Sequence, residues 1–136
     1  MKYVLLILAL LGVIVSAFAL REHYREAGDA PCSINARWDC GVVNHSPYAM
    51  FYGVPVAVIG IAGYLLLGVL AFHRAYPWML PFVTIALVFA IHLADIENYV
   101  LGVWCLYCVI SLGIISLMTL LNLGTVIAQA ARKPSP

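Results

Sequence analysis

The sequence predicts an all-α integral membrane protein, a four-transmembrane-helix bundle with a long extracytoplasmic loop between its first and second helices. The first observation behind this prediction is composition. The 136 residues are 65% hydrophobic and 10% charged, with a mean hydropathy of +1.02, which lies outside the range of ordinary soluble domains. The second observation is a set of four apolar runs, each near the roughly 20 residues that a helix needs to cross hydrocarbon. These runs are residues 3–20, 51–72, 78–99 and 104–127.

One long polar segment separates the first and second apolar runs. Residues 21–50 contain four of the six acidic residues and two of the four cysteines. The other connections are short, at residues 73–77 and 101–103, so consecutive helices should pack antiparallel. The whole chain, residues 1–136, is therefore expected to form a single membrane domain.

The basic residues near the ends of the apolar runs predict the orientation of the bundle. Cytoplasmic loops carry an excess of Lys and Arg. One side holds Lys2, Arg74, Arg132 and Lys133, and the other holds Arg21, Arg25 and Arg37. We expect both termini in the cytoplasm and the loop on the outer face of an inner or plasma membrane. A cleavable signal peptide ending near Ala17-Phe18-Ala19 is the alternative for the first run, and it also leaves the loop outside.

Small residues and one proline mark the second run. Gly60, Gly63 and Gly68 should let this helix approach its neighbours closely. Pro55 is expected to kink it.

The sharpest chemical motif is the C-x2-C pair Cys105 and Cys108 at the predicted start of the fourth helix. Both sulfurs fall on one helical turn, close enough for a disulfide. The unpaired amides and dipole of a helix N-terminus favour a thiolate, which is the nucleophilic form of cysteine. Two buried packing cysteines, or a zinc site built from all four cysteines, are the alternatives.

A second pair, Cys32 and Cys40, lies in the polar loop on the same predicted face. Taken alone, such a pair could be a static staple of the loop. Thiol–disulfide exchange, however, needs only a thiolate within reach of a disulfide sulfur, so two pairs on one face make a redox relay plausible. The C-x7-C spacing is wide for a zinc knuckle, and an oxidising compartment favours disulfides, so we predict no metal site.

A relay needs an electron acceptor. The sequence has no haem attachment motif, no dinucleotide-binding glycine fingerprint and no iron–sulfur spacing. A membrane quinone, such as ubiquinone or menaquinone, fits best, and it would reach Cys108 from the lipid side. The contacts predicted by position are Phe51, Tyr52, Tyr107 and Ile110.

Two polar residues are predicted to support the redox chemistry. Glu97, near the outer end of the third helix, could buffer protons for quinone reduction, although it could equally mark the membrane interface. Ser46, a few residues after Cys40, could position or activate a sulfur, although loop polarity explains it nearly as well. A net charge of +1 without a basic run argues against nucleic-acid binding.

These residues together resemble the vitamin K epoxide reductase family, and in particular its bacterial-type homologues, which are four-helix quinone-linked thiol oxidoreductases. The resemblance covers nearly the whole chain. It rests on the C-x7-C loop, on the segments 46–49 (SPYA) and 52–55 (YGVP), and on Glu97 with the segment 102–109 (GVWCLYCV).

The resemblance implies an order of electron transfer. Cys32 would meet a thioredoxin-like extracytoplasmic partner, Cys40 would exchange with Cys105, and Cys108 would pass electrons to quinone. Ser46 matches the loop serine near the redox centre of the family. The polar Asn and Tyr that hold the ligand in animal members align with Ala49 and Leu112, which makes vitamin K epoxide a doubtful substrate but keeps Leu112 as an expected quinone contact.

The expected function is therefore that of a quinone-dependent oxidase that reoxidises a separate thioredoxin-like protein, since no fused thioredoxin-like domain follows the fourth helix. A non-enzymatic metal-binding or metal-transport membrane protein, using the same four thiols as ligands, is the alternative. A carrier that sends electrons outward is a further possibility, because the same relay runs both ways.

Overall fold

The computed structural model describes residues 1–24, 50–51, 53–102 and 104–132. Four long helices dominate these ranges: α1 (Lys2–Tyr24), α3 (Val56–Phe72), α4 (Tyr76–Ile96) and α5 (Leu106–Arg132). A π-helical turn, η2 (Glu97–Leu101), continues α4, and two short strands, β1 (Met50–Phe51) and β2 (Val54–Pro55), precede α3.

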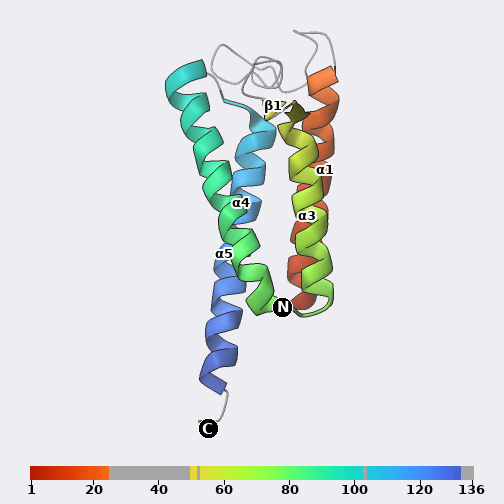
Figure 1. The fold of residues 1–136 in the computed structure, drawn as a ribbon, viewed down its shortest axis with the longest axis vertical. Helices are drawn as coiled ribbons and strands as arrows, with labels where there is room; N and C mark the ends of the chain where they lie inside the picture. Colours follow the sequence, from red (N-terminus) through yellow and green to blue (C-terminus); the bar gives the residue numbers. More distant parts are fainter. Residues whose placement is uncertain (25–49, 52, 103, 133–136) are drawn as a thin grey trace.

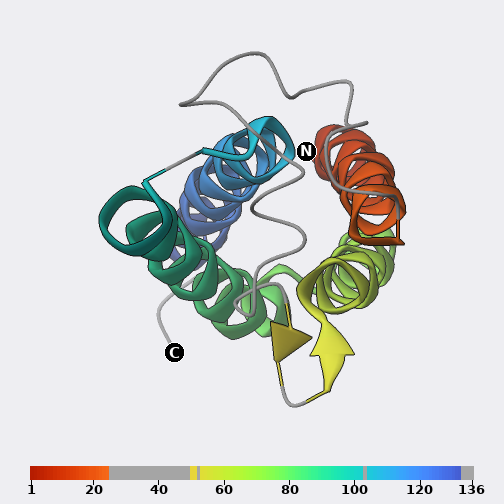
Figure 2. The same cartoon turned by 90° about the horizontal axis from the view of Figure 1, so that it is seen from above.

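The four helices run alternately up and down along the long axis of the molecule (Figure 1). Seen from above, the helices form a ring, with α1 beside α3 and α4 beside α5 (Figure 2). Contacts between α1 and α5 close the ring on one side, whereas α3 and α4 touch more sparsely on the other. The described part of the chain is therefore an all-α bundle, as the sequence predicts.

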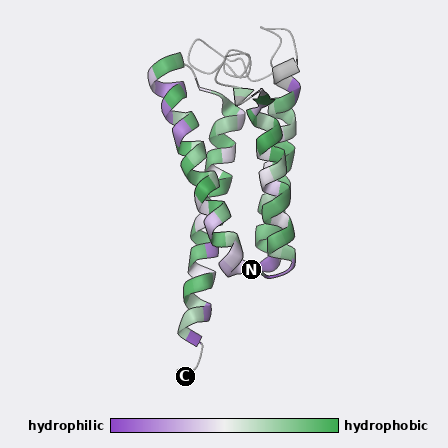
Figure 3. Cartoon of the chain, in the orientation of Figure 1, coloured by the Kyte–Doolittle hydropathy of each residue, from purple (hydrophilic) through white to green (hydrophobic). Residues whose placement is uncertain are grey.

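The helices consist of hydrophobic residues along most of their length (Figure 3). Large hydrophobic side chains such as Leu65, Ile85 and Leu120 are more than half exposed, which suits a lipid solvent rather than water. Within the described ranges, three segments are long and apolar enough to cross a membrane: Lys2–Arg21, Tyr76–Leu101 and Leu106–Arg132. Helix α3 is also apolar but has 17 residues, so it falls just short of that length.

The predicted boundaries of the second helix need correction. The prediction began this helix at Phe51, but α3 begins at Val56, because β1 and β2 form a two-stranded antiparallel hairpin before it. Gly53 lies between the strands with φ 80°, a conformation that glycine adopts without a steric cost. Pro55 is the N-cap of α3, so it does not kink the helix as expected. A proline at a helix start loses no helical hydrogen bond.

The other helices are slightly longer than predicted. Helix α1 covers residues 2–24 where 3–20 were expected, and α5 covers residues 106–132 where 104–127 were expected. The third helix was predicted over residues 78–99, and α4 with η2 spans 76–101. The apolar runs thus located each helix but not its polar ends.

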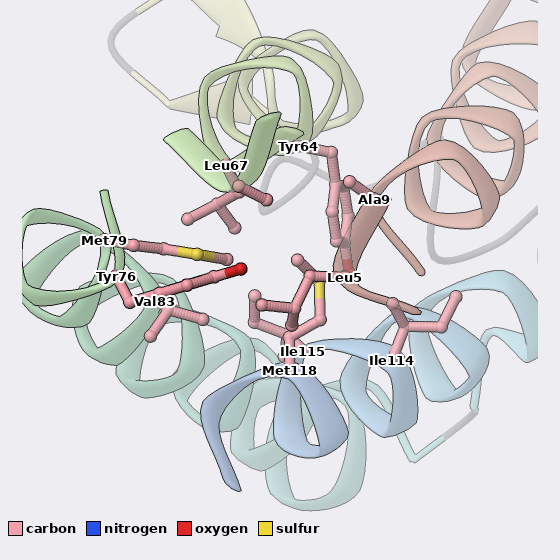
Figure 4. Packing of buried hydrophobic residues seen from close by; sticks show 11 residues of the cluster. Leu5, Ala9, Tyr64, Leu67, Tyr76, Met79, Val83, Ile114, Ile115 and Met118 are labelled. Carbon is pink, nitrogen blue, oxygen red and sulfur yellow. The ribbon is translucent and has the colours of Figure 1, made fainter. Parts of the chain in front are cut away.

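The core lies in the half of the bundle that includes the chain's N-terminus. Side chains from all four helices converge there, including Leu5, Leu67, Met79 and Met118 (Figure 4). The buried Asn122 adds a polar link, because its Nδ2 donates a hydrogen bond to the Tyr76 carbonyl at 3.2 Å.

Close packing of α1 against α3 depends on small residues. A Cβ added at Gly12 would collide with the Tyr64 ring, and one added at Gly60 would lie 2.9 Å from Ser16 Oγ. Gly68 approaches Ala9 in the same way, at ordinary contact distance. The expectation of close approach is thus met at Gly60 and Gly68, whereas an added Cβ at Gly63 would meet nothing within 4 Å.

Candidate functional site

The Cys105/Cys108 pair lies at the start of α5. The Cys105 carbonyl accepts a hydrogen bond from the Val109 N–H at 3.0 Å, the i to i+4 bond that opens the helix. Cys105 therefore stands directly before the helix, and Cys108 lies in its first turn. The two thiols interact with each other through a side-chain hydrogen bond, so the C-x2-C spacing brings the two side chains together as the sequence predicts.

A glycine turn brings Glu97 back to this pair. Gly102 ends η2 with φ 69° and reverses the chain before α5. As a result, Glu97 Oε2 accepts a hydrogen bond from the Cys105 N–H at 3.4 Å. The Glu97 carboxyl group and the Cys108 thiol are also hydrogen-bonded. A π-helical turn of this kind is common at functional sites.

The two cysteines differ in how deeply they are buried. Cys105 is fully buried, with 0% of its surface exposed, and packs against Leu101, Leu106 and Tyr107. Glu97 is 3% exposed, which is unusual for a carboxyl group unless it has partners. Cys108 is half-buried and faces a cavity.

This cavity, of about 510 Å³, lies between all four helices. Its lining is mostly aliphatic and aromatic. The lining residues come from all four helices, from their middle parts and from the parts near the end that holds Cys105 and Cys108. Glu97, Tyr107 and Cys108 lie at one part of the wall. A largely apolar cavity of roughly 300 to 1,000 Å³ with a few convergent polar groups is the usual form of a small-molecule site.

Further polar groups line the same cavity and escaped the sequence prediction. The Tyr64 hydroxyl donates a hydrogen bond to the Ser111 carbonyl at 3.0 Å and shares another with Ser111 Oγ at 2.7 Å. Ser16, 6% exposed, lines the wall from α1. Ser111 follows Cys108 by three residues, so helical spacing could have placed it on the same face. Tyr64 offered a weaker signal, as the only tyrosine between Val56 and Phe72.

The predicted quinone contacts are distributed unevenly. Tyr107 lines the cavity and stacks on Phe18, with ring centroids 6.0 Å apart and an interplanar angle of 17°. Ile110 is 41% exposed, and Leu112 packs against the core cluster; neither is among the cavity-lining residues. Phe51 belongs to β1, and its side chain is not described.

Several predicted site residues lie outside the described residues. These are Cys32, Cys40, Ser46 and Tyr52. The roles assigned to them remain predictions. What the described part of the chain provides is a dithiol at a helix N-terminus, a buried carboxyl group beside it, and an apolar cavity that reaches one of the two sulfurs.

This arrangement suits two-electron thiol chemistry. The two sulfurs can form and break a disulfide with each other, and Glu97 can hold or release a proton next to Cys108. The cavity has the size and the apolar lining that a quinone ring requires, so the residues present fit such a cofactor.

Comparison with known proteins agrees with this description. No curated protein matches the chain. The model of the vitamin K epoxide reductase family matches residues 3–123, which cover most of the sequence. The matched region contains all the described helices apart from the first residue of α1 and the last turns of α5, together with both cysteine pairs. The chain therefore belongs to the vitamin K epoxide reductase family, a family of membrane oxidoreductases that couple thiol–disulfide chemistry to quinones.

Proposed function

We propose that this protein is a quinone-dependent disulfide oxidase that reoxidises a thioredoxin-like extracytoplasmic protein and so supports disulfide formation in exported proteins. The observation that carries the proposal is the position of Cys108. It shares one helical turn with Cys105 and lines a 510 Å³ apolar cavity that Glu97 also lines.

The proposed path of electrons runs from the loop cysteines to the helix pair. Helix α1 ends and α3 begins at the end of the bundle that holds Cys105 and Cys108 (Figure 1). The intervening segment, which contains Cys32 and Cys40, is therefore attached at this end through both of its termini. This attachment supports exchange between Cys40 and Cys105.

The chemistry balances as two successive exchanges and one transfer. The partner dithiol reduces the Cys32–Cys40 disulfide and is itself oxidised. The Cys40 thiolate then attacks Cys105 of the Cys105–Cys108 disulfide, and a second attack by Cys32 on Cys40 leaves Cys105 and Cys108 reduced. A quinone bound in the cavity supplies the acceptor for two electrons and two protons. Cys108 lines the cavity in which the quinone would lie, and Glu97 lies next to Cys108, where it would relay a proton.

The proposed topology follows the same geometry. Helix α3 is short, but it runs beside α1 between the same two ends of the bundle (Figure 1), and 17 residues lie at the lower limit for crossing hydrocarbon. Four crossings place both termini on one side. The basic residues Lys2, Arg74 and Arg132 gather at the end opposite the cysteines, which supports a cytoplasmic location for that end.

Single cysteine substitutions test the order of exchange. In Cys108→Ala, the Cys105 thiolate can attack Cys40 of the Cys32–Cys40 disulfide and release the Cys32 thiol, and no Cys108 thiol is present to displace Cys40 from Cys105. A mixed disulfide between Cys40 and Cys105 should therefore become detectable. Cys105→Ala, the matched control, should not trap it. Peptide mapping by mass spectrometry under non-reducing conditions gives the readout.

Cys32→Ala should abolish oxidation of the thioredoxin-like partner. If this variant oxidises the partner at the wild-type rate, or if Cys108→Ala forms no adduct between Cys40 and Cys105, the proposed order is wrong. Four persistent free thiols with stoichiometric bound metal would instead support the metal-binding alternative.

A further inference from the structure

A second hollow, of about 630 Å³, lies at the end of the bundle opposite the cysteines. Three basic side chains line it, and each comes from a different element: Lys2 from the start of α1, Arg74 from the α3–α4 connection, and Arg132 from the last turn of α5. No acidic residue is among the described residues of its wall. Its electrostatic potential therefore favours an anion.

The backbone at Arg74 is unusual for an arginine. Arg74 has φ 55°, in the left-handed region that glycine adopts more easily. It occupies the C′ position of α3 in a Schellman motif, since Ala75 N–H donates to the Leu70 carbonyl at 2.9 Å and Arg74 N–H donates to the Ala71 carbonyl at 3.1 Å. An arginine at a position that favours glycine points to a role for its side chain.

Lys2 is held at the same end by aromatic contacts. Its Nζ lies 4.3 Å from the centroid of the Phe72 ring and 5.7 Å from that of Tyr3. These cation–π contacts fix the ammonium group beside the α3–α4 connection without neutralising its charge.

The hollow also borders lipid-facing surface. Leu120 lines it and is 68% exposed, and Tyr3 lines it and is 71% exposed. An anion bound among the three cations would thus have an apolar wall next to it. This combination fits a phosphate headgroup whose acyl chains lie along the outside of α5, rather than a free anion in water.

We propose that the hollow lined by Lys2, Arg74 and Arg132 is a binding site for an acidic phospholipid, with the phosphate among the three basic groups and the acyl chains along Leu120. Because the three groups come from the two ends of the chain and from the α3–α4 connection, a bound lipid would tie together the ends of all four helices. The inference is independent of the redox chemistry at the other end.

The test compares the full-length protein in nanodiscs of phosphatidylcholine alone and of phosphatidylcholine with phosphatidylglycerol. Thermal unfolding and the number of lipids retained in native mass spectrometry are measured. We expect phosphatidylglycerol to raise the unfolding temperature of the wild type and to be retained in preference to phosphatidylcholine. Arg74→Gln and Arg132→Gln should each weaken retention roughly fivefold.

Two further variants make the test specific. Arg21→Gln removes the same charge from the opposite end of α1 and should keep the full effect of phosphatidylglycerol. Arg74→Gly should unfold at the same or a higher temperature than wild type in phosphatidylcholine, since glycine relieves the backbone, yet should lose the response to phosphatidylglycerol.

The proposal is overturned if the two lipids stabilise the wild type equally. It is also overturned if Arg21→Gln reduces the retention of phosphatidylglycerol as much as Arg74→Gln does. The proposal is also overturned if soluble glycerol phosphate raises the unfolding temperature as much as phosphatidylglycerol does, since the site would then bind a free anion.

Discussion

Glu97 is a carboxyl group that is only 3% exposed, and it is hydrogen-bonded to the Cys105 N–H and to the Cys108 thiol. Its contact with the Cys105 backbone holds the turn before α5, and its contact with the Cys108 thiol offers a proton acceptor at the cavity wall. A neutral amide at position 97 could still accept the hydrogen bond from the Cys105 N–H, but it could not accept a proton from Cys108. The two contributions can therefore be separated by substitution.

Glu97→Gln should slow quinone reduction by about a hundredfold, because general acid–base groups commonly contribute that much. It should leave disulfide formation between Cys105 and Cys108 by a chemical oxidant unchanged. Stopped-flow measurement of quinol formation, together with thiol counting, checks both expectations. Asp95→Asn is the matched control, since Asp95 is an exposed carboxyl group near the same helix end and should behave as wild type. If both variants slowed quinone reduction equally, the specific role assigned to Glu97 would be wrong.

The sequence indicated Cys105, Cys108 and Glu97 as candidate site residues, and the structure brings these three together, whereas other residues of the cavity wall were missed. A C-x2-C motif at a helix start is local in sequence. An acidic residue near the end of an apolar run is easy to notice, because placing a carboxyl group in lipid is energetically unfavourable and therefore rare. Tyr64 and Ser111 were missed because their hydrogen bond joins α3 to α5, which no local pattern reveals. Ile110 was chosen by proximity to Cys108, yet its place on α5 leaves it 41% exposed.

At the level of elements, hydrophobicity located the helices, and turn chemistry set their ends. The apolar run from Phe51 continues through Pro55, but Gly53 and Pro55 together favour a hairpin over a helical turn, so α3 begins at Val56. The pairing of α1 with α3 depends on a different feature, the absence of a side chain at Gly12, which lets the Tyr64 ring lie against the α1 backbone.

Gly12→Ala should destabilise the bundle by roughly 1 to 3 kcal/mol, because the added methyl group collides with the Tyr64 ring. The displaced ring should also lose its hydrogen bond to Ser111, so quinone reduction should slow. Thermal unfolding in detergent gives the first readout. Gly113→Ala is the control, since an added Cβ there meets nothing within 4 Å. The close-packing account fails if both variants unfold at the same temperature.

At the level of the whole molecule, the cavity is the property that the sequence could least reveal. Its wall combines residues from α1, α3, α4 and α5. Helices α3 and α4 contact each other sparsely, whereas α1 and α3 pack tightly, and this uneven packing leaves room for the cavity. No single helix carries a signal for it. The fold class, by contrast, followed from composition and from the four apolar runs, because lipid exposure requires apolar residues on every outward face.

Gly63→Leu should fill part of the cavity without a clash, because Gly63 lines it and an added Cβ meets nothing within 4 Å. We expect the KM for a short-chain quinone to rise about tenfold, which corresponds to a loss of roughly 1.4 kcal/mol of binding, with little change in unfolding temperature. Gly113→Leu adds the same side chain at an exposed site outside the cavity wall and should leave KM unchanged. A wild-type KM in Gly63→Leu would place the quinone elsewhere.

The most direct test of the central claim isolates the helix pair. In the double variant Cys32→Ala/Cys40→Ala, the remaining thiols belong to Cys105 and Cys108. This protein is reduced, placed in nanodiscs and mixed with quinone without oxygen, and its thiols are counted with an alkylating reagent. The account predicts loss of both thiols with formation of an equimolar amount of quinol. Persistence of both thiols in the presence of excess quinone would contradict it.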